Sequence, residues 1–182
     1  GFGTSLLPYT TIRTNPLFPL VNRLLLHRLL SQLAACDCRP VVVNCHHLPE
    51  QIEAALADWP EVGVQVEPEI LGTGGALRMA LDSMDNDPIL VMNGDLYHGI
   101  DPEWVYHRHL LSKNDVTLAL HDYPRFNTVA VAGDRVQGFG VGPQDNSLAF
   151  TGIHVVDPEV LERIARGRFH HIIDLYAELA LE

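Results

Sequence analysis

Short apolar runs alternate with longer amphipathic segments along the first two thirds of the chain. The short runs are rich in β-branched residues, as in strands that are buried on both faces of a parallel sheet. We expect such strands at 40–45, 62–66, 88–92 and 115–120. Between the runs, apolar residues recur at helical spacing, and we expect helices at 22–35, 49–58, 75–83 and 102–111. This alternation predicts a Rossmann-like α/β fold with a mixed, mainly parallel sheet and helices on both faces.

The pattern changes after residue 120. Two strands at 128–131 and 135–139 flank Ala132-Gly133-Asp134, which favours a β-hairpin. A further strand is expected at 150–156, a helix capped by Asp157 at 157–166, and a last helix at 171–181. The length of 182 residues suits one continuous domain, which we divide into an α/β core at 1–120 and a small β-rich part with closing helices at 121–182.

Both ends of the chain have an unusual context for this fold. The glycine-rich turn at 1–4 has no strand before it, although such turns normally follow the first strand of an α/β sheet. The chain also stops inside a helical pattern. The sequence therefore predicts that both ends are truncated.

Charge and composition narrow the functional classes. The formal net charge is −11, which argues against nucleic acid as a partner, since nucleic-acid binding needs a basic face. No apolar run reaches the ~18 residues of a membrane span, and no signal peptide is visible. With three cysteines and no C-x-x-C pattern, reduced thiols in a cytoplasmic protein are expected.

Three polar segments carry candidate chemistry. Gly1, Gly3 and Thr4 supply small residues and a hydroxyl, which suit a phosphate-binding turn. The run LGTGGAL at 71–77 opens a helix, where free N–H groups favour polar ligands; an N-cap by Thr73 is the alternative. Asn-Gly-Asp follows the strand at 88–92, at the end where open α/β sheets bind ligands, and Asp95 there has the chemistry to hold Mg²⁺.

The order and spacing of these segments resemble the nucleoside-diphosphate-sugar pyrophosphorylases, a family of nucleotidyltransferases. The resemblance covers almost the whole chain. It extends to several further residues and short segments: Pro8, Thr10, 16–19, 46–49, 124–127 and 150–153.

The resemblance implies a reaction and a set of roles. A sugar 1-phosphate attacks the α-phosphorus of a nucleoside triphosphate, most often UTP or GTP, and pyrophosphate leaves. Gly1, Gly3 and Thr4 would line the triphosphate, and Asp95 would bind Mg²⁺. The base and ribose would contact Gly72, Thr73, Gly74 and Gly75, with Glu67 and Glu69 nearby. The residues facing the sugar would be Asn93, Asn127, Thr151 and Gly152.

The chain departs from the family pattern where phosphate is held. Ser5 stands in place of an arginine, and Asn15 in place of the catalytic lysine. Arg13 is the nearest cation in sequence, but an extended chain does not place it where residue 15 lies. The only lysine, Lys113, lies in or just after a polar helix. Losing one charged phosphate contact costs roughly 3–4 kcal/mol of transition-state stabilisation, by analogy with an oxyanion donor.

Two later family segments are also missing. The stretch at 138–143 has no acid where relatives carry Glu-Lys-Pro, and no W-x-D-x-G-T segment with a second metal-binding aspartate occurs; Asp174 lies in a helical context. Three functions therefore remain open. They are a Mg²⁺-dependent sugar-1-phosphate nucleotidyltransferase, a non-catalytic nucleotide or nucleotide-sugar binding domain of the same fold, and a transferase for a phosphorylated non-sugar alcohol. The sequence leaves the oligomeric state open.

Overall fold

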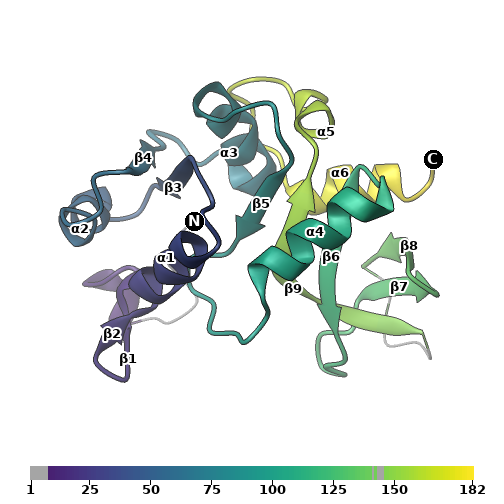
Figure 1. Ribbon diagram of the computed structural model, residues 1–182, viewed down its shortest axis with the longest axis horizontal. Helices are drawn as coiled ribbons and strands as arrows, with labels where there is room; N and C mark the ends of the chain where they lie inside the picture. The colour runs from purple at the N-terminus through teal and green to yellow at the C-terminus, as the bar shows by residue number, and fades with distance from the viewer. Residues whose placement is uncertain (1–7, 141, 143–145) are drawn as a thin grey trace.

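A computed structural model describes residues 8–140, 142 and 146–182 of the chain (Figure 1). The segments predicted as strands and helices are found close to their expected positions. The helices are α1 (Leu25–Ala35), α2 (Pro49–Ala55), α3 (Gly72–Ala80), α4 (Pro102–Ser112), α5 (Pro158–Glu162) and α6 (Ile172–Leu179). The strands are β1 (Pro19–Leu20), β2 (Arg23–Leu24), β3 (Val41–Cys45), β4 (Val62–Val66), β5 (Ile89–Met92), β6 (Val116–His121), β7 (Val129–Ala132), β8 (Arg135–Phe139) and β9 (Ser147–Val156). Short 3₁₀ turns are η1 (Tyr9–Thr11), η2 (Asn15–Leu17) and η3 (Leu81–Ser83).

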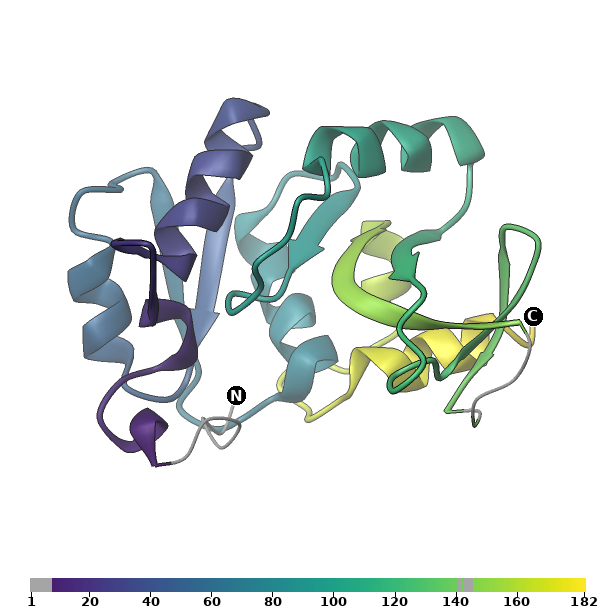
Figure 2. The same cartoon turned by 90° about the horizontal axis from the view of Figure 1, so that it is seen from below.

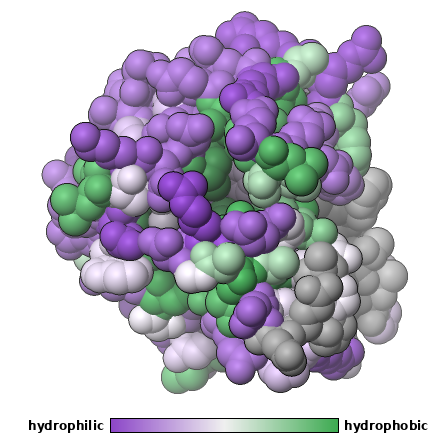
Figure 3. Space-filling model, turned by 90° about the vertical axis from the view of Figure 1, so that its right-hand side faces the viewer, coloured by the Kyte–Doolittle hydropathy of each residue, from purple (hydrophilic) through white to green (hydrophobic). Residues whose placement is uncertain are grey.

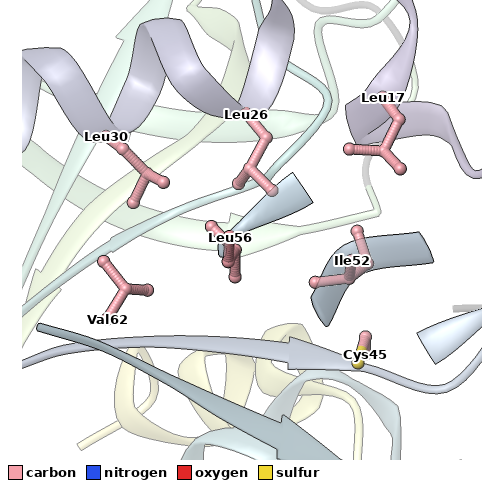
Figure 4. Packing of buried hydrophobic residues seen from close by; sticks show 7 residues of the cluster. All are labelled: Leu17, Leu26, Leu30, Cys45, Ile52, Leu56 and Val62. Carbon is pink, nitrogen blue, oxygen red and sulfur yellow. The ribbon is translucent and has the colours of Figure 1, made fainter. Parts of the chain in front are cut away.

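The first part of the chain builds its own core around a parallel pair of strands. β3 and β4 pair in parallel from Val41↔Val62 to Cys45↔Val66. On α1, Leu26 and Leu30 lie one turn apart, so both point from the same face of the helix toward the strands (Figure 4). The buried cluster consists of Leu17, Leu26, Leu30, Cys45, Ile52, Leu56 and Val62. Leu17 belongs to η2, so this core anchors the segment that carries Asn15.

The second part of the chain is organised around β9. This long strand pairs antiparallel with β5, β6 and β7, and β7 pairs antiparallel with β8. The expectation of a mainly parallel sheet needs a correction here, since β3–β4 is the parallel pair recorded among the described strands. β5 and β6, joined by α4, do run in the same direction, but β9 lies between them and pairs with both. The Rossmann-like mixed α/β class and the hairpin at Gly133 are confirmed.

Helices cover both faces of the sheet, as predicted. Figure 2 shows α4 on one side of β9, with α3 and α6 on the other. The second buried cluster includes Val156, Leu161, Ile164, Ile172, Leu175 and Tyr176. Helix α5 is shorter than the predicted 157–166, and Asp157 makes no side-chain cap. Instead, the Asp157 carboxylate lies 3.0 Å from Nε2 of the buried His109 on α4.

No helix in the described part of the chain is long and apolar enough to cross a membrane. The face made by β7, β8 and the C-terminal helix is mostly hydrophilic, with apolar residues in smaller groups between polar ones (Figure 3). Scattered exposed apolar side chains of this kind are ordinary for folded proteins.

Candidate active site

The end of β5 forms the centre of the candidate site. Asn93, Gly94 and Asp95 follow this strand directly, and the side chains of Asn93 and Asp95 are exposed. On the neighbouring β9, Gly152 has a φ of +82°, and its carbonyl accepts a hydrogen bond from the Asn93 amide at 3.2 Å. A Cβ at position 152 would lie within 2.4 Å of Asn93 Nδ2. Only glycine therefore allows β9 to approach Asn93 so closely.

The η2 turn lies against this end of β5. Asn15 Nδ2 donates a hydrogen bond to Asp95 Oδ2 at 3.0 Å, across 80 positions of sequence. Pro16 also contacts the turn, since its Cγ lies 3.3 Å from where a Cβ on Gly94 would be. The position that the sequence assigns to the catalytic lysine and the aspartate that it assigns to Mg²⁺ are therefore in direct contact.

The Asn15 side chain has one further feature. Its Oδ1 is buried and has no hydrogen-bond partner among the residues that the structure describes. Buried polar atoms are nearly always paired in folded proteins, so the unpaired Oδ1 sets Asn15 apart from most buried polar groups. Within the same described part of the chain, no three or more His, Cys, Asp or Glu side chains are arranged so that they alone could hold a metal ion.

The other cations considered from the sequence lie elsewhere. Arg13 is exposed, two residues before Asn15. Lys113 follows the last turn of α4 and precedes β6. Because β5 and β6 run in the same direction, Lys113 lies at the opposite edge of the sheet from Asp95. It therefore does not replace the missing lysine.

The glycines of α3 are packed against the loop before α6. The Gly74 and Gly75 amides both donate to the carbonyl of His170, at 2.8 and 3.3 Å, and the His170 amide donates to Leu71. A Cβ on Gly75 would lie 2.4 Å from the Arg168 carbonyl oxygen. The amides of Gly74 and Gly75 therefore already have hydrogen-bond acceptors within the protein, and both residues are buried.

Gly72 and Thr73 keep some surface, so any role in contacting base or ribose rests with them. Thr73 lies inside the first turn of α3 and is not its N-cap. Its hydroxyl accepts a hydrogen bond from the Ile172 amide, at the start of α6, at 3.1 Å.

Glu67 is a buried acid at the end of β4, with 3% of its surface exposed. Its two carboxylate oxygens accept from Asn44 Nδ2 at 2.6 Å and from the Leu71 amide at 2.9 Å. Glu67 thus fixes the segment that enters α3. The sequence analysis placed Glu67 near the base of the nucleotide. In the structure its carboxylate instead binds Asn44 and the Leu71 amide, so it positions the start of α3.

Two residues predicted to face the sugar are engaged in local structure. Asn127 is buried and closes the loop after β6, accepting from the Tyr123 amide and donating to Asp122, both at 2.8 Å. The Thr151 hydroxyl donates to the Ala119 carbonyl at 2.7 Å, beside a register shift between β6 and β9. Their place near a sugar stays a prediction. Gly1, Gly3, Thr4 and Ser5 lie outside the described residues.

The Asn-Gly-Asp turn lies at the carboxyl end of a strand, which is where open α/β folds bind their ligands. The nucleotidyl transferase family model matches residues 1–173, and the chain belongs to this family.

Two of the curated relatives that this chain resembles are sugar-1-phosphate guanylyltransferases. The chain is 32% identical over 178 residues to a mannose-1-phosphate guanylyltransferase of Mycobacterium tuberculosis, covering 92% of this chain and 50% of the relative. It is 28% identical over 145 residues to the D-glycero-alpha-D-manno-heptose 1-phosphate guanylyltransferase of Aneurinibacillus thermoaerophilus, covering 76% of this chain and 63% of that protein. The chain thus spans about half to two thirds of the length of these curated relatives.

Solved structures show the same fold. HddC of Yersinia pseudotuberculosis, complexed with GMP-PN, superposes with a TM-score of 0.75 at 20% identity, over 93% of this chain and 78% of that one. A UDP-glucose pyrophosphorylase complexed with UDP-glucose gives a TM-score of 0.77 at 14% identity, over 99% of this chain and 83% of that one. The predicted family and fold class are confirmed.

Proposed function

We propose that this chain forms the catalytic part of an enzyme that transfers a guanylyl group from GTP to a sugar 1-phosphate. A phosphate oxygen of the sugar forms a bond to the α-phosphorus of GTP, and the bond from that phosphorus to the leaving pyrophosphate breaks. The observation that carries the proposal is the contact between η2 and the end of β5, where Asn15 and Asp95 meet. The guanylyltransferases among the relatives support the choice of GTP.

Asp95 is the proposed anchor for Mg²⁺. Its exposed carboxylate matches the preference of Mg²⁺ for one or two carboxylates together with substrate phosphates. When bound, the cation would neutralise charge on the phosphates and orient them. Asn93 lies two residues away on the same turn, and we assign it to the hydroxyl groups of the sugar.

The protein's own contribution is positioning. In transfers of this type the protein holds the reacting groups in line and stabilises charge, with little covalent chemistry of its own. Asn15 holds the Asp95 carboxylate by one hydrogen bond, and Gly152 lets β9 lie beside Asn93. Gly72 and Thr73 are proposed to contact the base and ribose.

Pyrophosphate release tests this proposal. The chain is incubated with Mg²⁺, GTP or UTP, and a panel of sugar 1-phosphates that includes mannose 1-phosphate. We expect release with GTP, and its loss in Asp95→Asn. Release with UTP alone would replace GTP by UTP, and release with a phosphorylated alcohol alone would favour the non-sugar transferase.

A binding domain without turnover is the second candidate. The neutral Asn15 and Ser5, in place of two cations, favour it. Equilibrium binding of GDP-mannose, measured by calorimetry, separates the two candidates. Tight binding without pyrophosphate release under any substrate pair would establish the binding domain and reject the enzyme.

A further inference from the structure

Two adjacent histidines lie between the end of β3 and the start of α2. His46 Nδ1 is 2.7 Å from the carbonyl oxygen of Glu67, and His47 Nε2 is 2.7 Å from the carbonyl oxygen of Thr10. A carbonyl oxygen only accepts hydrogen bonds, so His46 must carry a proton on Nδ1 and His47 must carry one on Nε2. Each imidazole therefore donates to the backbone of a different segment.

The segment that the second histidine holds leads to the candidate site. Thr10 belongs to η1, which lies between the phosphate-binding turn predicted at 1–4 and Asn15. Gln51 on α2 adds another hydrogen bond, since its Nε2 donates to the Ile12 carbonyl at 2.9 Å. The segment lies beside α2, as Figure 2 shows. The region around the start of α2 thus fixes the chain that runs from the predicted phosphate side to Asn15.

The segment that His46 holds leads to the start of α3. Glu67 directly follows β4, and its amide also donates to the Cys45 carbonyl at 2.8 Å. The Glu67 carboxylate accepts from the amide of Leu71, one residue before α3. His46 therefore fixes the backbone from which Glu67 positions the helix start that is proposed to contact base and ribose.

The turn after the two histidines has an unusual backbone conformation. Leu48 has a φ of 51° and a ψ of 55°, in the left-handed region that is unfavourable for a bulky side chain. Strain of this kind persists only where the surrounding structure imposes it. The two imidazole hydrogen bonds, which hold the residues just before Leu48, are contacts that can do so.

We propose that His46 and His47 are positioning residues for the nucleotide. One nucleotide must span the phosphate side and the base side, so the spacing between the two segments decides whether both of its ends can bind together. The two imidazoles fix that spacing, because they extend from one short turn and hold one segment each. A site ordered in advance loses less free energy on binding. This inference rests on the proposed function, which supplies GTP as the ligand.

Equilibrium binding of GTP tests the inference without any need for turnover. Calorimetry in the presence of Mg²⁺ gives the Kd of GTP for the unaltered chain, His46→Leu and His47→Leu. We expect each substitution to raise this Kd roughly three- to tenfold, the effect of losing one hydrogen bond. His27→Leu is the matched control, since His27 Nε2 lies at the same 2.7 Å from the Ala55 carbonyl but joins α1 to α2. It should leave the Kd of GTP unchanged.

Amide substitutions test which ring nitrogen matters, and they serve also where a leucine variant fails to fold. The NH₂ group of asparagine lies near the position of imidazole Nδ1, and that of glutamine near Nε2. His46→Asn and His47→Gln should therefore bind GTP nearly as the unaltered chain does. The exchanged pair, His46→Gln and His47→Asn, displaces the donor and should bind as weakly as the leucine variants. Equal binding by both amide pairs, or an equal loss in His27→Leu, would overturn the inference.

The outcome is separable from that of the proposed function. If the Kd of GTP follows the expected order while no pyrophosphate is released, the positioning role stands and the transferase fails. If pyrophosphate is released while the His46 and His47 variants bind GTP as the unaltered chain does, the transferase stands and the positioning role fails. A lack of GTP binding by the unaltered chain would overturn both.

Discussion

The two glycine-containing segments that follow β4 and β5 resemble each other in sequence but differ in what they contact. The segment at 93–95 follows β5 directly, and the segment at 72–75 follows β4 after a loop of five residues, 67–71. The segment at 72–75 is covered by the loop before α6, and its amides at Gly74 and Gly75 bind the carbonyl of His170. The segment at 93–95 leaves Asn93 and Asp95 exposed. In both segments a glycine lets another part of the protein approach closely: the backbone of the loop before α6 in the first, and the ring of Pro16 in the second.

The substitution Asp95→Asn should show most clearly that the segment at 93–95 serves activity and not stability. We expect guanylyl transfer to fall by roughly 10²–10³-fold, by analogy with the loss of one charge-stabilising group. Thermal stability should stay within about 0.5 kcal/mol, because the residue is exposed. Pyrophosphate release and the unfolding temperature are measured together. Asp85→Asn, in an exposed acidic loop, is the matched control and should change neither; a large loss of stability in Asp95→Asn would contradict this assignment.

The substitution Gly75→Ala, in the segment at 72–75, is expected to lower the stability of the fold. The added methyl would lie 2.4 Å from the Arg168 carbonyl oxygen, so α3 and the 168–172 loop must move apart. Overpacking of this kind costs about 1–3 kcal/mol. Denaturant unfolding should show a lower midpoint. Gly138→Ala, with no atom within 4 Å of the new Cβ, should keep a midpoint close to that of the unaltered chain. An unchanged midpoint in Gly75→Ala would refute the packing role.

Mild acid should weaken the packed region through His154. This residue on β9 is buried against Phe150 and the edge of Tyr176 on α6, and burial lowers its pKa from 6.5 to about 3. The unfolded chain therefore binds an extra proton between these two values, so stability is full above pH 6.5 and falls as the pH drops toward 3. From pH 7.5 to 5 the loss is about 2 kcal/mol. His154→Leu should remove that part of the pH dependence; a slope that persists unchanged would assign the effect to other groups.

The smallest expected effect is at Thr73→Val. The substitution keeps the shape of the side chain but removes the acceptor for the Ile172 amide. A lost hydrogen bond of this kind costs about 1 kcal/mol. Denaturant midpoints of Thr73→Val and of the exposed Thr128→Val provide the comparison. Equal midpoints would show that this hydrogen bond adds no stability.

The sequence predicted the elements well because they depend on local periodicity. The strands expected at 62–66 and 135–139 have the same bounds in the structure. Helix α4 also begins at Pro102, as expected. It did not predict that β9 pairs between β5 and β6, since the insertion of a distant strand has no local signal. Likewise, the contact of Gly75 with the Arg168 carbonyl depends on a loop more than 90 positions away.

The site was predicted in part. Asn15 and Asp95 were both singled out, through the resemblance to a family, and the structure brings them together. The carboxylate partners of Glu67 could not be foreseen, because they lie on β3 and at the start of α3. The signal for a structural role of Glu67 is its position, since it is an acid directly after a strand and five residues before the glycine-rich start of α3.

The two hydrophobic clusters have different consequences for the order of folding. The first is built entirely from residues 17–64, whereas the second joins residues as far apart as Leu77 and Leu179. β9 must also wait for β5, some sixty positions earlier in the chain. Contacts that are close in sequence form faster than distant ones. The unit that holds the η2 turn should therefore form first, and the hydrogen bond between Asn15 and Asp95 should form only when the slower sheet around β9 has closed.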